Sequence, residues 1–184
     1  MNKSLKAIIE SQIGEAVLSE IYGSGKIRTE SGKEYFLKTG PPTTAYACEA
    51  NGLKELTKPA KLHIAKVISF GETYLLTEHI APGLPSINFH REFGKNLAKM
   101  HQYKSKAFGF FENNFIGVTP QINVPEAEEE TDWTAFYFNK RLLFQYKLAE
   151  ANGYITEVLR KGFNHIEKII SSLLNDSKEP PTLL

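Results

Sequence analysis

The stretch from residue 34 to residue 56, EYFLKTGPPTTAYACEANGLKEL, decides the fold because it joins a strand pattern to a helix pattern across two prolines. Residues Glu34 to Lys38 form a short apolar run bounded by turn-forming residues, which is typical of a strand. The prolines stop this strand, and Thr43 or Thr44 can cap a helix that runs to about Thr57. The sequence therefore predicts a strand followed by a single helix.

Two charged residues in this stretch are candidates for an ion pair. Leu53 and Leu56 follow Glu49 at helical spacing, so its carboxylate lies on the apolar stripe of the helix and needs a partner. Lys38, at the end of the apolar strand, is the nearest candidate. A strand lysine paired with a helix glutamate holds ATP phosphates in protein-kinase-like folds. Two surface charges on an ordinary α+β domain explain the pair alone equally well.

The residues around this stretch predict further short elements. The expected elements are a helix over Leu5 to Ile13 and strands over Ala16 to Tyr22, Lys26 to Glu30, Lys66 to Phe70 and Tyr74 to Thr77. The last strand runs into Glu78 and then a break at Pro82, Gly83 and Pro85. A strand in that position suits an inter-lobe connection whose backbone could read the edge of an adenine.

After the break the pattern is mostly helical. Three apolar stripes lie at helical spacing, with members Phe89, Phe93, Leu97 and Met100; Trp133, Tyr137, Phe144 and Leu148; and Ile155, Leu159, Ile166, Ile169, Ile170 and Leu173. The connection from about Phe108 to Thr131 is long enough to be either well packed or functional. Within it, the acidic run from Glu126 to Glu130 is interpreted as a solvated helix entry.

Composition excludes several functional classes. The 22 basic residues nearly balance 21 acidic ones, so no net field favours nucleic acid or an anionic membrane as a partner. Cys48 is the single cysteine, which excludes an intrachain disulfide and a cysteine metal cluster. The histidines lack metal-ligand spacing, so no metal site is predicted. The N-terminal apolar stretch is too short for a signal peptide or a membrane span, which indicates a cytoplasmic protein.

Six motifs in one order resemble the fructosamine kinase (ketosamine-3-kinase) family, whose relatives are the aminoglycoside phosphotransferases. They are FLK at 36–38, CEANGL at 48–53, FGKNLAKMH at 93–101, FGF at 108–110, NFIGVTPQIN at 114–123 and DWTAFYFNKRL at 132–142. The resemblance runs from about Glu34 to Leu184. It implies an α+β, protein-kinase-like fold, with an antiparallel β-rich nucleotide lobe over residues 1–80 and an incomplete helical lobe over residues 81–184.

The resemblance also implies an activity and a nucleotide site. The family moves the ATP γ-phosphate to the 3-hydroxyl of small-molecule or protein-bound ketosamines, as a step of deglycation repair, with ATP and Mg²⁺ as cofactors. By position, Lys38 would bind the α and β phosphates, Glu49 would orient Lys38, and the backbone of Glu78 and Ile80 would hold adenine. Gly23 and Gly25 stand where the family carries a Gly-Gly-x-Ile-Asn type loop, but their turn is shorter.

The end of the sequence bears on catalysis. The residues from Pro180 to Leu184 look like the approach to the family's His-Gly-Asp-Leu-Trp catalytic loop. No catalytic residue is therefore assigned: the catalytic Asp and the Mg²⁺ ligands are expected beyond Leu184, and the 184-residue chain is expected to be inactive alone. The alternative is a non-catalytic remnant or regulatory module that binds nucleotide or a partner. Helix faces left uncovered would favour self-association.

Three residues of the second half could line a sugar pocket by stacking and hydrogen bonding: Asn123, Trp133 and Arg141. Arg141, however, shares a stripe with Trp133 and Tyr137. A structural arginine packed among aromatic rings is therefore at least as good an interpretation.

Overall fold

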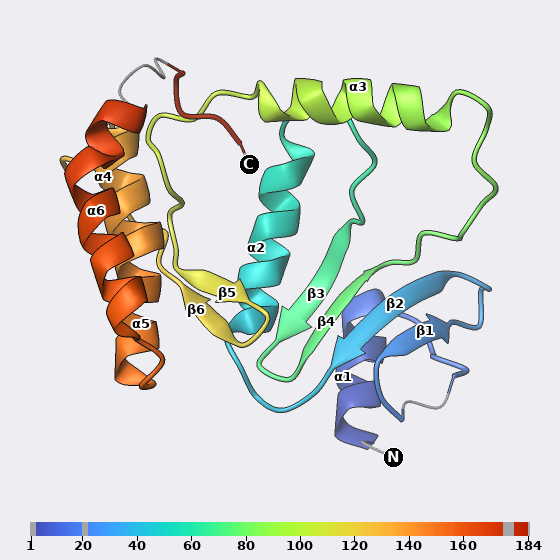
Figure 1. Ribbon diagram of the computed structural model, residues 1–184. Helices are drawn as coiled ribbons and strands as arrows, with labels where there is room; N and C mark the ends of the chain where they lie inside the picture. Colours follow the sequence, from blue (N-terminus) through green and yellow to red (C-terminus); the bar gives the residue numbers. More distant parts are fainter. Residues whose placement is uncertain (1–2, 20–21, 175–178, 184) are drawn as a thin grey trace. The chain divides into compact units, whose positions relative to one another are not determined.

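A four-stranded antiparallel sheet organises the first of the two units into which the chain divides, Met1–Met100 and His101–Leu184 (Figure 1). The computed structural model describes residues 3–19, 22–174 and 179–183. Antiparallel strands with helices agree with the predicted α+β fold. The division falls after Met100, and the lobe boundary expected near Ile80 stays a prediction.

The sheet of unit 1 has the strand order β1-β2-β4-β3. Its strands are β1 (Gly25–Arg28), β2 (Glu34–Thr39), β3 (Val67–Gly71) and β4 (Tyr74–Glu78), close to the bounds that the sequence predicts. The strand expected over Ala16 to Tyr22 is wrong: only Val17 pairs, in an isolated bridge with Thr29, and residues 20 and 21 lie outside the described residues. The reason is local, because the Ser19 hydroxyl, not a backbone carbonyl, accepts the Arg28 amide proton at 2.9 Å.

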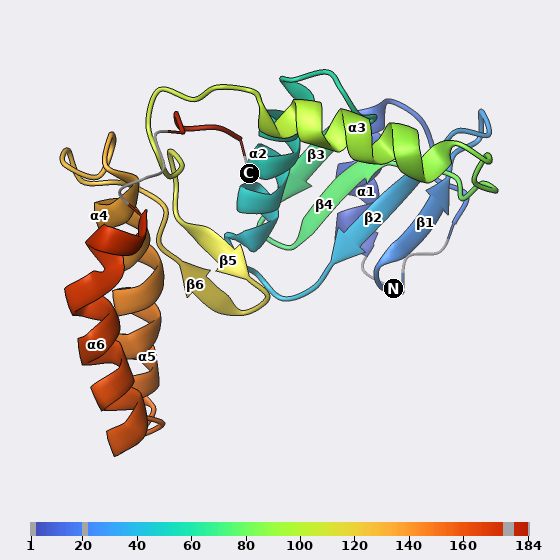
Figure 2. The same cartoon turned by 45° about the horizontal axis from the view of Figure 1, so that its top comes forward.

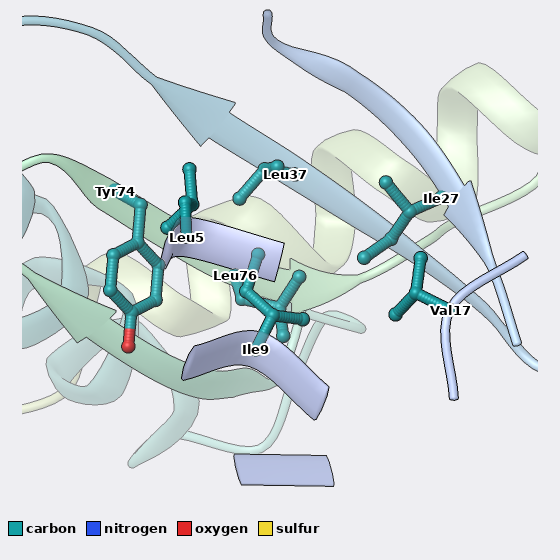
Figure 3. Packing of buried hydrophobic residues seen from close by; sticks show 7 residues of the cluster. All are labelled: Leu5, Ile9, Val17, Ile27, Leu37, Tyr74 and Leu76. Atoms are coloured by element: carbon teal, nitrogen blue, oxygen red, sulfur yellow. The ribbon is translucent and has the colours of Figure 1, made fainter. Parts of the chain in front are cut away.

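Two helices pack on opposite faces of this sheet, because neighbouring residues of a strand point to opposite faces. On one face, Leu5 and Ile9 of α1 (Lys3–Ile13) meet a cluster that includes Leu76 of β4 (Figure 3). On the other, Tyr46 and Ala50 of α2 meet Leu75. Burying a leucine contributes about 2 kcal/mol, so β4 stabilises both layers. The side of the sheet that carries Leu75 is called the α2 face below.

Helix α2 (Ala45–Thr57) has the bounds that the sequence predicts, with Thr44 at the N-cap. The Thr44 side chain makes no capping hydrogen bond; instead the Thr43 hydroxyl accepts the Ala45 amide proton at 3.2 Å. Both threonines named from the sequence therefore belong to the helix start, and one of them contributes a side-chain oxygen.

Unit 2 contains a hairpin and a helical pair. The hairpin consists of β5 (Asn114–Ile116) and β6 (Thr119–Gln121), so the long connection predicted from the sequence is partly ordered. Helix α3 (Phe89–His101) is the last element of unit 1, which ends at Met100, and precedes the hairpin in the chain. The helical run consists of α4 (Trp133–Tyr137), the π-helical segment η1 (Phe138–Leu143) and α5 (Phe144–Ala151), and α6 (Glu157–Leu174) lies alongside it (Figure 2). The second apolar stripe is thus not one continuous α-helix.

Candidate nucleotide site

Lys38 and Glu49 form an ion pair, as the sequence predicts. The Lys38 Nζ atom lies 2.5 Å from Glu49 Oε2. Lys38 is on the α2 face because its partner across the ladder is Leu75. The inward position expected for the glutamate is wrong: the two side chains are 49% and 41% exposed. Tyr46 and Ala50 occupy the buried stripe of α2, which leaves Glu49 at the rim of the helix.

This exposure determines what the pair can do. A lysine ammonium carries three donors, and Glu49 takes one of them. Exposed ion pairs contribute at most about 1 kcal/mol to folding, so the pair adds little to the stability of unit 1. It fixes the direction of a cation that can still bind an anion from solvent.

An exposed aromatic ring lies on the same face as Lys38. Phe36 is two residues before Lys38 in β2, so both side chains point to the α2 face. Its ring is 43% exposed. Sequence reasoning missed Phe36 as a site residue, although its spacing of two from Lys38 in a predicted strand is the signal that could have found it.

The end of β4 carries the two residues expected to hold adenine. The Glu78 carboxylate accepts from the Lys66 amide at 3.2 Å and contacts His63 Nε2 at 3.1 Å. The Lys66 amide, followed by His63, holds the pKa of the Glu78 carboxyl below its usual value. Ile80 is 52% exposed, and its backbone makes no hydrogen bond within the described residues. The adenine role of both residues stays a prediction.

The Gly23–Gly25 turn leads into β1, whose first residue is Gly25, at the end of the sheet where Lys38 lies. A Cβ added at Gly23 or at Gly25 would meet no atom within 4 Å, so both positions adjoin open space. The Ser24 hydroxyl between them donates to the Thr39 carbonyl at 3.2 Å and accepts from the Thr39 amide at 2.9 Å. The turn is therefore tied to the residue that follows Lys38.

The three residues expected in a sugar pocket have structural contacts in unit 2. Arg141 donates to the Ile122 carbonyl at 2.5 Å and to Asn123 Oδ1 at 2.8 Å, and its guanidinium lies 4.9 Å from the centre of the Phe136 ring. Asn123 is 4% exposed and donates through Nδ2 to Asn114 Oδ1 at 2.8 Å. Burial lowers the pKa of the Arg141 guanidinium. This set is called the Arg141 network below.

Trp133 belongs to an aromatic cluster in the same unit. Its ring centre lies 5.3 Å from those of Phe108 and Tyr137 and 6.0 Å from that of Phe136. The contact of Arg141 with the Phe136 ring agrees with the interpretation of Arg141 as a structural residue among aromatic rings. A sugar-binding role for Asn123, Trp133 and Arg141 stays a prediction.

One acidic residue differs from its interpretation. The sequence pattern predicts a solvated acidic run from Glu126 to Glu130, but Glu129 is 1% exposed. Its carboxylate accepts from Asn139 Nδ2 at 2.9 Å and lies 3.1 Å from Lys140 Nζ. Burial opposes the charge of this group, but the hydrogen bonds and Lys140 hold the pKa of Glu129 below its usual value. Its partners are ten and eleven residues further along, and no local pattern in the sequence reveals that pairing.

The described part of the chain has neither a group of metal ligands nor a membrane-spanning helix. No group of three His, Cys, Asp or Glu residues there could hold a metal ion. None of the helices described is long and apolar enough to cross a membrane. The predicted Mg²⁺ requirement, the absence of a membrane partner and self-association stay predictions. Along α6, Val158 and Leu173 are exposed apolar residues.

Curated proteins are similar to this chain in sequence. The chain is 34% identical over 166 residues to a protein of Enterococcus faecium named a probable ketoamine kinase, covering 86% of this chain and 56% of that protein. It is also 34% identical over 164 residues to a chloroplastic protein-ribulosamine 3-kinase of Arabidopsis thaliana, covering 83% of this chain and 48% of that protein. The chain thus spans about half the length of the curated relatives it matches.

Solved structures share the same architecture. A crystal structure from Thermobifida fusca, named as a fructosamine-3-kinase, superposes with a TM-score of 0.79 at 24% identity. The superposition covers 98% of this chain and 65% of the other chain. At this level of identity the similarity shows the fold alone. The family model for fructosamine kinase matches residues 3–184. With most of its length in that match, the chain belongs to the fructosamine kinase family.

Proposed function

We propose that unit 1 binds ATP on the α2 face. It would provide the nucleotide-binding site of a kinase that phosphorylates the 3-hydroxyl of ketosamines. The observation that carries this proposal is the Lys38–Glu49 pair. In it the half-exposed Lys38 ammonium is held in position by the Glu49 carboxylate. The relatives named as ketoamine kinase and protein-ribulosamine 3-kinase support the substrate class. The proposed biological role is deglycation repair.

Each residue of the α2 face has a part in this proposal. Phosphoryl transfer depends on positioning and on neutralising the charge of the phosphates. The Lys38 ammonium binds the α and β phosphates, and Glu49 holds the ammonium in place by accepting a hydrogen bond from it. Phe36 offers an exposed apolar surface for the base, and the backbone near Glu78 and Ile80 reads its edge. Magnesium bound to the nucleotide supplies further positive charge to the phosphates.

Ligand-dependent thermal unfolding tests nucleotide binding. We expect ATP with Mg²⁺ to raise the melting temperature of the wild-type chain, because a ligand that binds only the folded state stabilises it. Lys38→Met should reduce that shift, because it weakens ATP binding. Lys33→Met is the control, because the Lys33 side chain is 66% exposed and pairs with Glu15 at 3.3 Å. Absence of any shift at millimolar ATP would refute nucleotide binding.

A coupled assay with ATP and a ribulosamine tests the reaction class. Phosphorylation of the sugar that requires Lys38 would support the kinase assignment directly. Binding of ATP without sugar phosphorylation would support only the nucleotide-binding part of the proposal, which the kinase hypothesis shares with the alternative, a module that binds nucleotide without transferring phosphate.

A further inference from the structure

The Ser24 side chain occupies a position that backbone atoms hold elsewhere in the sheet. In the antiparallel pair β1–β2, Gly25 lies opposite Leu37. Two residues further along β2 is Thr39, so a continued ladder would pair Thr39 with residue 23. The structure instead has the Ser24 hydroxyl donating to the Thr39 carbonyl and accepting from the Thr39 amide.

One hydroxyl can replace a backbone unit in this way because it carries one donor and two acceptor lone pairs. Both polar backbone groups of Thr39 are satisfied, and residue 23 is left outside the ladder. The amides of Gly23 and Ser24 have no hydrogen-bond acceptor among the described residues. They lie at the start of β1, because Ser24 immediately precedes Gly25, and the register of the Gly25–Leu37 pair, continued by one residue, would place Ser24 opposite Lys38.

The residue that anchors Ser24 is itself fixed from the other side. The Thr39 hydroxyl donates to the Thr73 carbonyl at 2.8 Å, and the Gly40 amide donates to the same oxygen at 3.2 Å. Thr39 thus joins the Gly23–Gly25 turn to the connection between β3 and β4. The hydroxyl of Ser24 is bonded to the end of β2 that also carries the Lys38–Glu49 pair.

Amide protons that are not used in a sheet are suitable donors to an anion, and successive ones form anion-binding concavities. We propose that Ser24 is a positioning residue: its hydroxyl takes the ladder position of residue 23 and so keeps the Gly23 and Ser24 amides, beside Lys38, for the phosphates of a nucleotide. This inference rests on the proposed function. The Ser24 side chain would thus hold the short Gly23–Gly25 turn in place.

The test compares three variants with two probes. Ser24→Ala removes the hydroxyl, and Ser24→Thr keeps one. Ser19→Ala is the matched control, because the Ser19 hydroxyl accepts the Arg28 amide at the opposite end of β1, at 2.9 Å. Affinities for ATP and for adenosine, which lacks phosphates, are measured by calorimetry. Circular dichroism verifies that each variant is folded.

Ser24→Ala should weaken ATP binding about tenfold while adenosine binding stays within about twofold, because only phosphates use the two amides. Ser24→Thr keeps a hydroxyl and should bind ATP about as tightly as the wild type. Ser19→Ala should lower the melting temperature without changing the ratio of the ATP and adenosine affinities. In ¹⁵N spectra of the wild type, ATP but not adenosine should shift the Gly23 and Ser24 amide signals.

Two results would overturn the inference. Equal ATP affinity of wild type and Ser24→Ala, with ATP binding intact, refutes the role of Ser24 and leaves the proposed function standing. A wild-type chain that binds neither ATP nor adenosine refutes the proposed function and this inference with it. If Ser24→Ala is unfolded, the Gly23 and Ser24 amide shifts in the wild type decide the outcome.

Discussion

Lys38 in unit 1 and Arg141 in unit 2 are both cations that bind oxygen atoms, but they differ in how much hydrogen-bonding capacity remains. Lys38 gives one bond to Glu49 and stays half exposed. Arg141 donates to the Ile122 carbonyl and Asn123 Oδ1 and packs on Phe136. The first has donors to offer a ligand, whereas the second has committed them to its own chain.

This difference separates binding from stability. Removing a partner from a buried polar group costs about 1 to 3 kcal/mol for each group left without a bond. An exposed pair is worth at most about 1 kcal/mol. Substitutions in the Arg141 network should therefore act on the folding of unit 2, and substitutions at Lys38 should act on ligand binding.

The largest effect is expected for Arg141→Met. It leaves the Ile122 carbonyl and Asn123 Oδ1 without their donor, so unit 2 should lose about 3 kcal/mol of unfolding free energy. Trp133 is the only tryptophan of the chain and lies in unit 2, so its fluorescence during urea unfolding reports that unit. Lys147→Met, at an exposed position of α5, is the control. Equal unfolding midpoints for Arg141→Met and Lys147→Met would contradict a structural role of Arg141 in unit 2.

A smaller loss is expected where the chain passes close to the Arg141 network. Gly109 has φ +88°, and a Cβ there would collide with the Asn123 carbonyl oxygen and approach the Phe136 ring. Gly109→Ala should cost about 2 kcal/mol in the same unfolding experiment. Gly153→Ala isolates backbone strain, because Gly153 has φ +75° but no atom within 4 Å of an added Cβ. The collision is unimportant if both variants lose the same amount.

Lys38→Met should act on the other side of the comparison. ATP affinity should fall by about tenfold or more, because a charged hydrogen bond to phosphate is lost. The unfolding free energy should change by less than about 1 kcal/mol. Calorimetry and urea unfolding of the same sample measure the two quantities. A large loss of stability with unchanged ATP affinity would contradict this prediction. Lys38 would then have a structural role, like Arg141.

The smallest effect is expected from acid. Hydrogen bonding, chiefly from Ser31, lowers the pKa of Glu15 from 4.5 to about 2. Because the pKa in the folded state is lower, this stabilisation is present above about pH 4.5 and is lost as the pH falls toward 2. Glu15→Gln should flatten the pH dependence of unit 1 in that window, measured by hydrogen exchange of the β1 and β2 amides. An unchanged profile would assign acid sensitivity to other carboxylates.

Elements with strong local signals could be predicted from the sequence. The bounds of α2 follow from two prolines, two threonines and an apolar stripe, and the strands of the sheet follow from short apolar runs between glycines. The Lys38–Glu49 pair was also predicted. The exposure of that pair was not, because it depends on how far α2 is rotated about its axis when Tyr46 and Ala50 pack on Leu75.

The remaining features depend on contacts between distant residues. Glu129 is buried because Asn139 and Lys140 reach it from a π-helical segment, and a period-3.6 stripe does not reveal such a segment. The hairpin had a weak signal at Gly117, whose φ of +62° suits its turn. Ser24 carried no signal, because its importance comes from the Thr39 backbone groups that it satisfies.

The strand order of the sheet has a consequence for how unit 1 folds. β1 with β2, and β3 with β4, are hairpins between neighbours in sequence, but the β2–β4 pairing must bring together strands separated by the whole of α2. Local contacts form sooner than those that close long loops. We therefore expect two preformed hairpins to join at the Leu37–Leu76 pair in the rate-limiting step, which makes the centre of the sheet its last part to form.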